Sequence, residues 1–313
     1  MENLFDTINN PETSDDEFTP SGERHWNSYR YRQKLIKIWK ALAAGHDFYW
    51  PDIIGICEVE NSAVIHDLIH KTPLGVGGYS FFHRDSYDRR GIDVALLYRT
   101  DFFQPVDSGY IQVSFPKEPD YHTRDILYMK GFSKTAGDTL VVFVNHWPSR
   151  YGGFMETEGF RHTCAKVLRR CVDSVTRLNP ASKILIIGDF NDTPYNESVT
   201  RTLKAEWSFS QPHDTALYNI SYYLAEKKKY WTYWYQGRGD FLDQVIVSGA
   251  LLNSQKGLSI NPDDVYPLRN SFLFDEKGRP FRTYMGPRYM GGFSDHLPMV
   301  INFQVRDNAG IDR

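Results

Sequence analysis

Short apolar runs that stop abruptly at polar residues recur along this 313-residue chain. Residues 184–187 are four apolar positions, mostly β-branched, and Gly188 and then acids and amides follow them. Such a run predicts a strand that is buried on both faces. Asp189 and Asn191 stand two residues apart, so an extended backbone would point both side chains the same way. Ligand sites in α/β proteins gather at the carboxyl ends of strands, although a simple Asx turn explains this segment equally well.

The rest of the pattern predicts many strands and few helices. Helical spacing of apolar residues predicts helices over 29–44, over 157–178 and, shorter, after a capping Asn61. Strands are predicted at 51–57, 79–83, 92–98, 109–115, 126–132, 140–145, 229–235, 243–248 and 298–303. Residues 6–28 and 261–294 are predicted to be long loops. No repeat or linker divides the chain, so we expect a single domain over 1–313 with sheets packed as a sandwich and helices outside.

The composition fits a folded protein that is not strongly basic. Hydrophobic residues make up 41% of the chain, aromatic residues 15%, and the net charge is −3. This argues against a strongly basic nucleic-acid binder but leaves room for a local basic groove. The three cysteines suggest neither a disulfide framework nor a cysteine metal site. We expect no membrane span and no signal peptide in the residues given; localisation and oligomeric state stay open.

Chemistry-bearing residues stand where the apolar runs begin or end. They are Glu58, Asn145, His146, Asp189, Asn191, Asp243, Asp295 and His296. Each alone has an ordinary explanation, such as a solvated acid or a packed histidine. Together they supply the parts of a metal-dependent hydrolase, because oxygen ligands suit Mg²⁺ or Mn²⁺ better than zinc. Clustered carboxylates would otherwise repel one another by about 1–4 kcal/mol per close pair, and imidazoles can transfer protons.

These motifs, in this order, resemble the endonuclease/exonuclease/phosphatase superfamily, which includes pancreatic-type DNase, abasic-site endonucleases, neutral sphingomyelinases and inositol polyphosphate 5-phosphatases. The matching segments are 2–6 (ENLFD), 56–61 (ICEVEN), 93–99 (DVALLYR), 145–147 (NHW), 188–191 (GDFN), 242–246 (LDQVI) and 294–298 (SDHLP). They cover nearly the whole chain. The resemblance implies a four-layer α/β/β/α sandwich, in which two packed mixed sheets carry outer helices.

The resemblance also implies a role for each site residue. Glu58, Asp295 and Glu2 would bind the metal, Mg²⁺ or alternatively Mn²⁺. Asp189 and Asn191 would hold the attacking water and a phosphate oxygen, and Asp243 would orient His296 through a hydrogen bond. His146 would stabilise or protonate the leaving oxygen, and Asp88 or Asp93 could pair with it. Arginines near the motifs could bind phosphate or be ordinary surface residues; they are Arg99, Arg150, Arg161 and Arg282.

The chain departs from the family pattern at its beginning. Relatives carry an Asn two residues before the position of Glu2, in the first strand. We expect that strand to be missing here, either because the true start lies upstream or because the sequence is incomplete. Residues 1–5 should still lie beside Glu58 in the sheet.

The predicted function is Mg²⁺-dependent, nuclease-like phosphoester hydrolysis by in-line attack of water on a phosphodiester or phosphomonoester. The alternative is a catalytically impaired relative that binds phosphate or nucleic acid without cleaving it. The presence of the whole residue set favours the enzyme. The substrate is not legible from the sequence: nucleic acid, a sugar or inositol phosphate and a phospholipid head group all remain open.

Overall fold

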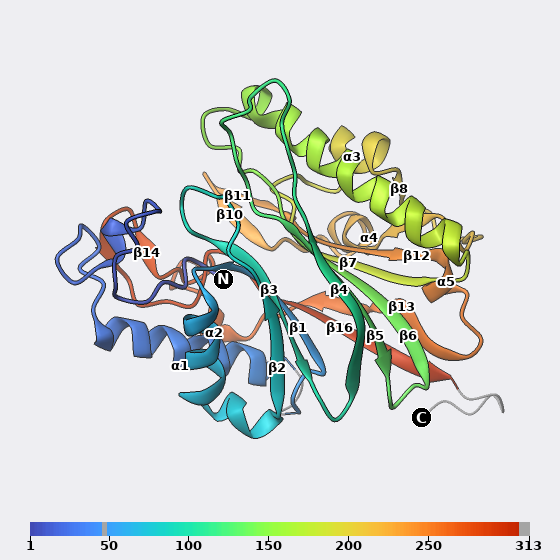
Figure 1. Ribbon diagram of the computed structural model, residues 1–313, viewed down its shortest axis with the longest axis horizontal. Coiled ribbons are helices and arrows are strands. Elements are labelled where there is room, and N and C mark those ends of the chain that lie inside the picture. Colours follow the sequence, from blue (N-terminus) through green and yellow to red (C-terminus); the bar gives the residue numbers. More distant parts are fainter. Residues whose placement is uncertain (46–48, 307–313) are drawn as a thin grey trace.

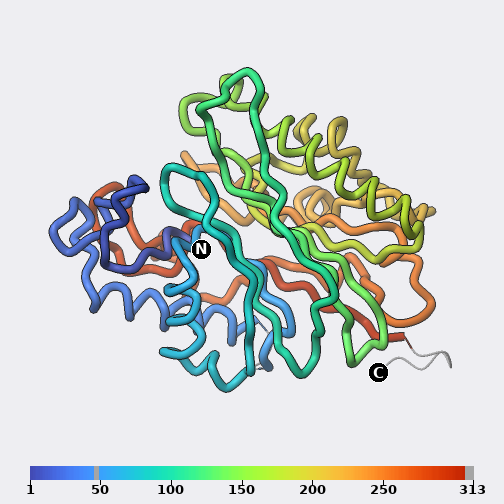
Figure 2. The backbone as a smooth tube through the Cα atoms, viewed as in Figure 1, coloured from blue at the N-terminus to red at the C-terminus, as the bar shows by residue number. Residues whose placement is uncertain are grey.

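A seven-stranded mixed sheet forms the centre of the computed structural model, which describes residues 1–45 and 49–306 (Figures 1 and 2). Its neighbouring strands are antiparallel except for two parallel pairs, β6 with β7 and β8 with β9. In sheet order the strands are β4 (Phe103–Ile111), β5 (Ile126–Ser133), β6 (Asp138–His146), β7 (Lys183–Asp189), β12 (Asp243–Ser248), β9 (Leu217–Asn219) and β8 (Ala205–Glu206). Residues 307–313 of the predicted domain lie outside the described part.

A second layer packs on this sheet, and it consists of two separate antiparallel sheets. One has the order β1 (Ile53–Val59), β3 (Asp93–Arg99), β2 (Tyr79–His83), and the other pairs β13 (Gly257–Pro267) with β16 (Met299–Arg306). Side chains alternate along the strands. Val94 and Leu96 of β3 face the large sheet, and Ala95 and Leu97 face the helices on the other side. Two small hairpins complete the strands: β10 (Tyr233–Tyr235) with β11 (Arg238–Asp240), and β14 (Tyr284–Met285) with β15 (Arg288–Tyr289).

Helices cover both outer faces of the sandwich (Figure 1). On the second layer lie α1 (Ser28–Ala44) and α2 (Ser62–His70), and on the large sheet lies α3 (Phe154–Leu178). As predicted, Asn61 caps α2, because its side chain accepts the Val64 amide. Two short helices, α4 (Ile220–Glu226) and α5 (Gly249–Leu252), flank β12. Among the helices in the described ranges, none has both the length and the apolar character needed to cross a membrane.

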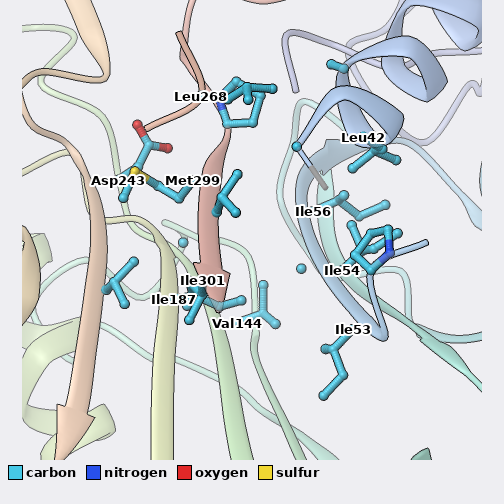
Figure 3. Close-up of a pocket in the computed structure, with 18 of the residues that line it drawn as sticks. Leu42, Ile53, Ile54, Ile56, Val144, Ile187, Asp243, Leu268, Met299 and Ile301 are labelled. Atoms are coloured by element: carbon cyan, nitrogen blue, oxygen red, sulfur yellow. The ribbon is translucent and has the colours of Figure 1, made fainter. Parts of the chain in front are cut away.

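An apolar groove separates the two sheets of the second layer (Figure 3). The cavity measures about 530 Å³ and lies between β1 and β16, with Val144 and Ile187 of the large sheet among its lining. Within the described residues, β1 pairs along its length only with β3, and β16 only with β13. At one end of the groove, Leu4 bridges Val59 in a parallel sense and its amide donates to Glu58 O at 2.9 Å. Residues near the start of the chain therefore lie beside Glu58, as expected.

The mixed α/β sandwich agrees with the predicted fold class, while three predicted segments were wrong. The strand predicted at 229–235 is present only as β10, Tyr233–Tyr235. The strand predicted at 109–115 is β4, which runs from Phe103 to Ile111. Residues 261–294 are not one long loop, because β13 continues to Pro267 and β14 and β15 follow. The polar stretch from Asn261 to Asp264 hid this strand. It falls where the pairing of β13 with β16 shifts between Ile260 and Val265, so its polar side chains interrupt the apolar pattern without ending the strand.

Candidate active site

Three predicted site residues lie in a row across three neighbouring strands. His146 ends β6 and pairs in register with Asp189 at the end of β7, and Asp189 in turn pairs with Asp243 at the start of β12. Since β12 runs antiparallel to β7, the beginning of one strand meets the end of the other. The sheet therefore brings together side chains that are far apart in the sequence.

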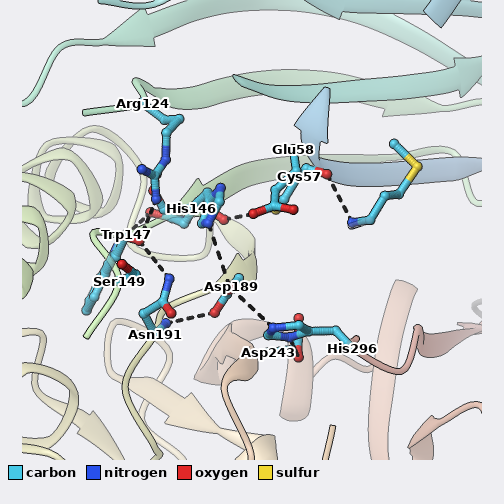
Figure 4. Close-up of polar contacts among 12 residues, drawn as sticks. Cys57, Glu58, Arg124, His146, Trp147, Ser149, Asp189, Asn191, Asp243 and His296 are labelled. Carbon is cyan, nitrogen blue, oxygen red and sulfur yellow. Dashed lines mark hydrogen bonds and ion pairs between the residues drawn. The ribbon is translucent and has the colours of Figure 1, made fainter. Parts of the chain in front are cut away.

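His296 joins this row from the segment before β16 (Figure 4). Its Nδ1 lies 2.8 Å from Asp243 Oδ2, a hydrogen bond, and its Nε2 lies 3.9 Å from Asp189 Oδ2. On the other side, His146 Nε2 lies 3.7 Å from the same Asp189 oxygen. One carboxylate thus stands between two imidazoles, and a second carboxylate orients one of them. The predicted pairing of Asp243 with His296 is present.

The last residues of β7 and the loop that follows have backbone conformations that allow close contacts. Gly188 has φ +131°, and a Cβ there would lie 1.9 Å from Asn145 O, so only glycine fits. Asn191 has φ +50°, a left-handed conformation that asparagine tolerates. Its amide donates to Asp189 Oδ1 at 2.8 Å, and its Nδ2 donates to Trp147 O at 2.9 Å. The loop fixes both the carboxylate and the carboxamide.

The predicted metal ligands line the facing side of the site. Glu58 lies at the bulge of β1, between the paired residues Cys57 and Val59, with φ +62°, and its Oε2 accepts the Asn3 amide at 2.9 Å. Asp295 pairs with Arg282 at 3.0 Å. Glu2 is buried and accepts the Thr283 and Tyr284 amides. A direct bond from Glu2 to a metal would compete with these amides, so that role stays a prediction.

The electrostatics separate the two imidazoles. Burial lowers the pKa of His146 well below its usual value, and the charges of Arg124 and Arg90 lower it further. Burial acts in the same direction on the pKa of His296, but the carboxylates of Asp243 and Asp189 outweigh it and raise that pKa to about 10. At neutral pH one imidazole is therefore neutral and the other is a cation, an arrangement suited to distinct roles.

The carboxylates suit a divalent cation. The pKa of Asp189 is raised to about 7, mainly by burial, with the charges of Asp243 and Glu58 adding to it and His296 opposing it. A bound cation would offset the free-energy cost of keeping these carboxylates charged in a buried site. Mg²⁺ takes one or two carboxylates and keeps several waters, so Glu58 and one neighbour suffice.

A different group of potential ligands is already gathered near the β2–β3 connection. His83, Asp85 and Asp93 each offer one ligand atom, and these atoms lie within 4.8 Å of one another; no other such group is found among the residues described. Asp85 is 80% exposed, and Asp93 also accepts the Ser86 amide. Sequence analysis did not predict this group.

The four arginines occupy different places. Arg161 is fully buried and bound to Asp192 at 2.8 Å, so it has no surface for substrate and the interpretation as a phosphate ligand was wrong. Arg150 donates to Asn191 O at 2.7 Å and is partly exposed at the site. Arg282 is 38% exposed and contacts Asp295. Arg99 closes β3, at the end of the strand opposite the site, and binds Gly77 O.

Arg124 is a site residue that sequence analysis missed. This buried guanidinium donates to His146 O at 3.2 Å, to Trp147 O at 2.6 Å and to Asp88 Oδ2 at 2.9 Å. It holds the backbone that carries His146. The two acids considered as partners for His146 are thus engaged elsewhere, Asp88 with Arg124 and Asp93 with His83 at 3.4 Å. No local motif marks Arg124, which lies in the loop before β5.

Replacing Arg124 with Ala should lower the free energy of unfolding by about 3–5 kcal/mol, because it leaves the buried Asp88 charge and two carbonyls without a partner. Urea denaturation followed by circular dichroism measures this. Arg201→Ala is the matched control, since Arg201 forms an exposed helical ion pair with Glu197 that should contribute under about 1 kcal/mol. Equal losses in the two variants would show that Arg124 does not hold the loop.

The model of the endonuclease/exonuclease/phosphatase family matches residues 1–305, and the chain belongs to that family. No curated protein matches the chain in sequence.

Several solved structures share the fold. A humanized zebrafish (D. rerio) TDP2 is 14% identical, with a TM-score of 0.57, over 88% of this chain and 93% of that one. A Bacteroides thetaiotaomicron mannosyl-6-phosphatase is 18% identical, with a TM-score of 0.55, over 96% and 97%. The human Nocturnin catalytic domain, with bound sulfate, is 19% identical, with a TM-score of 0.50, over 81% and 80%. At these identities the likeness concerns the fold alone.

Proposed function

We propose that this protein hydrolyses phosphoesters with the help of a divalent cation, Mg²⁺ or alternatively Mn²⁺, by in-line attack of water on phosphorus. The observation that carries the proposal is the position of Asp189 Oδ2, between the Nε2 atoms of His146 and His296. Family membership supports the reaction class. The nucleophile in this reaction is water and not a side chain, so no covalent enzyme intermediate is required.

The chain's own residues divide the work. Asp189 accepts a proton from the attacking water, and Asn191, fixed by its hydrogen bonds, positions that water and a phosphate oxygen. His296, held as a cation by Asp243, donates a hydrogen bond to a phosphoryl oxygen as negative charge develops. His146, held neutral by burial, donates an N–H hydrogen bond that stabilises the negative charge on the leaving oxygen, and that oxygen takes its proton from solvent water after the P–O bond breaks.

Glu58 and Asp295 would hold the cation, with Glu2 as a further candidate. When bound, the cation supplies positive charge that stabilises the phosphoryl oxygens and the leaving group. Arg282 contacts Asp295 and Glu2, whereas Arg150 contacts the Asn191 carbonyl. Both keep partly exposed guanidinium groups that can bind a second phosphate oxygen.

A substrate panel tests the proposal. Supercoiled plasmid, abasic duplex, single strands, bis-p-nitrophenyl phosphate, inositol phosphates and mannose 6-phosphate are each incubated with MgCl₂ or with EDTA. We expect turnover of at least one substrate with MgCl₂ and none with EDTA. Equal rates under both conditions contradict the dependence on a cation. Phosphate binding without turnover of any substrate would favour the alternative, a catalytically impaired binding relative.

A further inference from the structure

The β10–β11 hairpin presents four side chains on one face. Tyr233 pairs with Asp240 and Tyr235 with Arg238. Residues two apart on a strand, and residues directly opposite on an antiparallel partner, share a face. We call these four residues the hairpin face. The two-residue connection, Gln236 and Gly237, has φ +46° and +82°, as a tight hairpin turn requires.

The hairpin face begins at the catalytic histidine. The Tyr233 ring lies 4.7 Å from the His296 imidazole, and the two residues also form a backbone bridge. On the other strand, Asp240 lies 3.8 Å from Arg150, the residue that binds the Asn191 carbonyl. Contacts on both strands therefore fix the hairpin to the site.

Tyrosine rings continue outward from this point. The Tyr235 ring is nearly parallel to that of Tyr233, at 15°, with centroids 6.3 Å apart. Tyr233 is half-buried, whereas Tyr235 is 57% exposed. By contrast, Trp234 points to the other face and packs on Trp231 at 5.1 Å. Packing explains Trp234, but it does not explain the exposed Tyr235 ring, which lies next to the tyrosine that contacts the His296 imidazole.

We infer that the hairpin face binds a ring on the organic part of the substrate, stacked on Tyr235 while the phosphate lies at His296. This inference rests on the proposed function and deepens it by naming the substrate class: phosphoesters that bear a nucleobase or a sugar ring. Both ring types offer a face to tyrosine, and stacking of a base on an aromatic side chain contributes enough to alter affinity roughly tenfold. The exposed guanidinium of Arg238 lies at the edge of this platform.

Three phosphate monoesters of primary alcohols test the inference, with release of inorganic phosphate as the readout. Their alcohols are thymidine (through its 5′ oxygen), mannose (through its 6 oxygen) and methanol, which has no ring. In Tyr235→Ala, the ratio of kcat/KM for a ring-bearing ester to that for the methyl ester should fall about tenfold. If the ratio falls only for the thymidine ester, the hairpin face binds a base; if it falls only for the mannose ester, the face binds a sugar. A fall of both ratios shows that the face binds either ring.

Two variants serve as controls. Tyr235→Phe keeps the ring and should keep the ratio within about twofold of the unmodified protein. Tyr29→Ala removes a similarly exposed tyrosine from α1 and should change nothing. A ratio unchanged in Tyr235→Ala, or lowered as far in Tyr235→Phe as in Tyr235→Ala, would overturn the inference.

Failure of the proposed function is separable from failure of the inference. If the protein cleaves none of the three esters, they serve as stable ligands, and calorimetry with MgCl₂ compares their association constants in the same variants. Ring-dependent binding without cleavage supports the hairpin face and counts against the proposed reaction. Cleavage without ring dependence supports the proposed reaction and counts against the hairpin face as a binding site.

Discussion

Replacing Glu58 with Gln should lower Mg²⁺-supported hydrolysis on the order of 10²–10³-fold, the usual cost of removing one group that stabilises transition-state charge. Gln keeps the size of the side chain and can still accept the Asn3 amide that Glu58 Oε2 accepts at 2.9 Å. The charge is what it lacks. Steady-state rates over a MgCl₂ titration measure the effect, and a weakened cation site should show a higher Mg²⁺ concentration at half-maximal rate.

Glu60→Gln is the matched control, because Glu60 lies two residues after Glu58, directly after the end of β1. Burial raises the pKa of Glu60 to about 8, so its carboxyl is largely protonated at pH 7 and the amide mimics it. Glu60 also accepts a backbone amide, from Asp6. We expect Glu60→Gln to keep its activity and its melting temperature. If both variants lose activity to the same extent, Glu58 has no special role in holding the cation.

Replacing Asp243 with Asn should cost about 10²–10⁴-fold in kcat, the range for residues that support acid–base chemistry. Asp243 holds Nδ1 of His296 at 2.8 Å and is a main reason why that imidazole keeps its proton. With the carboxylate gone, the pKa of His296 should fall. As the pH is raised, the remaining activity should therefore be lost at a lower pH than in the unmodified protein, because the imidazole gives up its proton earlier. A pH profile of kcat/KM measures this shift.

The double variant Asp243→Asn with His296→Gln examines whether the two side chains act as a unit. If they do, the double variant should be little worse than either single one, since the second change removes what the first has already disabled. Asp263→Asn, which breaks an exposed contact with Lys228, controls for loss of an acid as such. Losses that multiply fully would show independent action.

The residues of the site were easier to predict than their surroundings. Glu58, Asp189, Asp243 and His296 each adjoin a short apolar run in the sequence. In the folded protein, strand pairing brings such segments together, as it does for Asp189 and Asp243. The pairing itself is not written in any one segment, so their convergence rested on the family resemblance. The roles assigned to these residues remain predictions until activity is measured.

Contacts between distant segments explain what the sequence could not indicate. Arg124 binds carbonyls about twenty residues away, and nothing near it in the chain distinguishes it from a surface arginine. Arg161 looked exposed because it is an arginine on a helix, yet Asp192 draws it into the interior. One signal was available and unused: the aromatic run from Tyr230 to Tyr235 is unusually dense, and its alternation separates the hairpin face from Trp234.

The groove between β1 and β16 divides the residues of the site into two groups that are held in place differently. Glu58 belongs to β1 and His296 precedes β16, so the two stand on opposite banks of an apolar void, whereas His146, Asp189 and Asp243 share one hydrogen-bonded sheet. Within the described residues no strand pairing joins β1 to β16, whereas strand pairing joins every member of the row on the large sheet. Sheet register therefore sets the spacing within the row, while side-chain packing across the groove sets the spacing between Glu58 and His296.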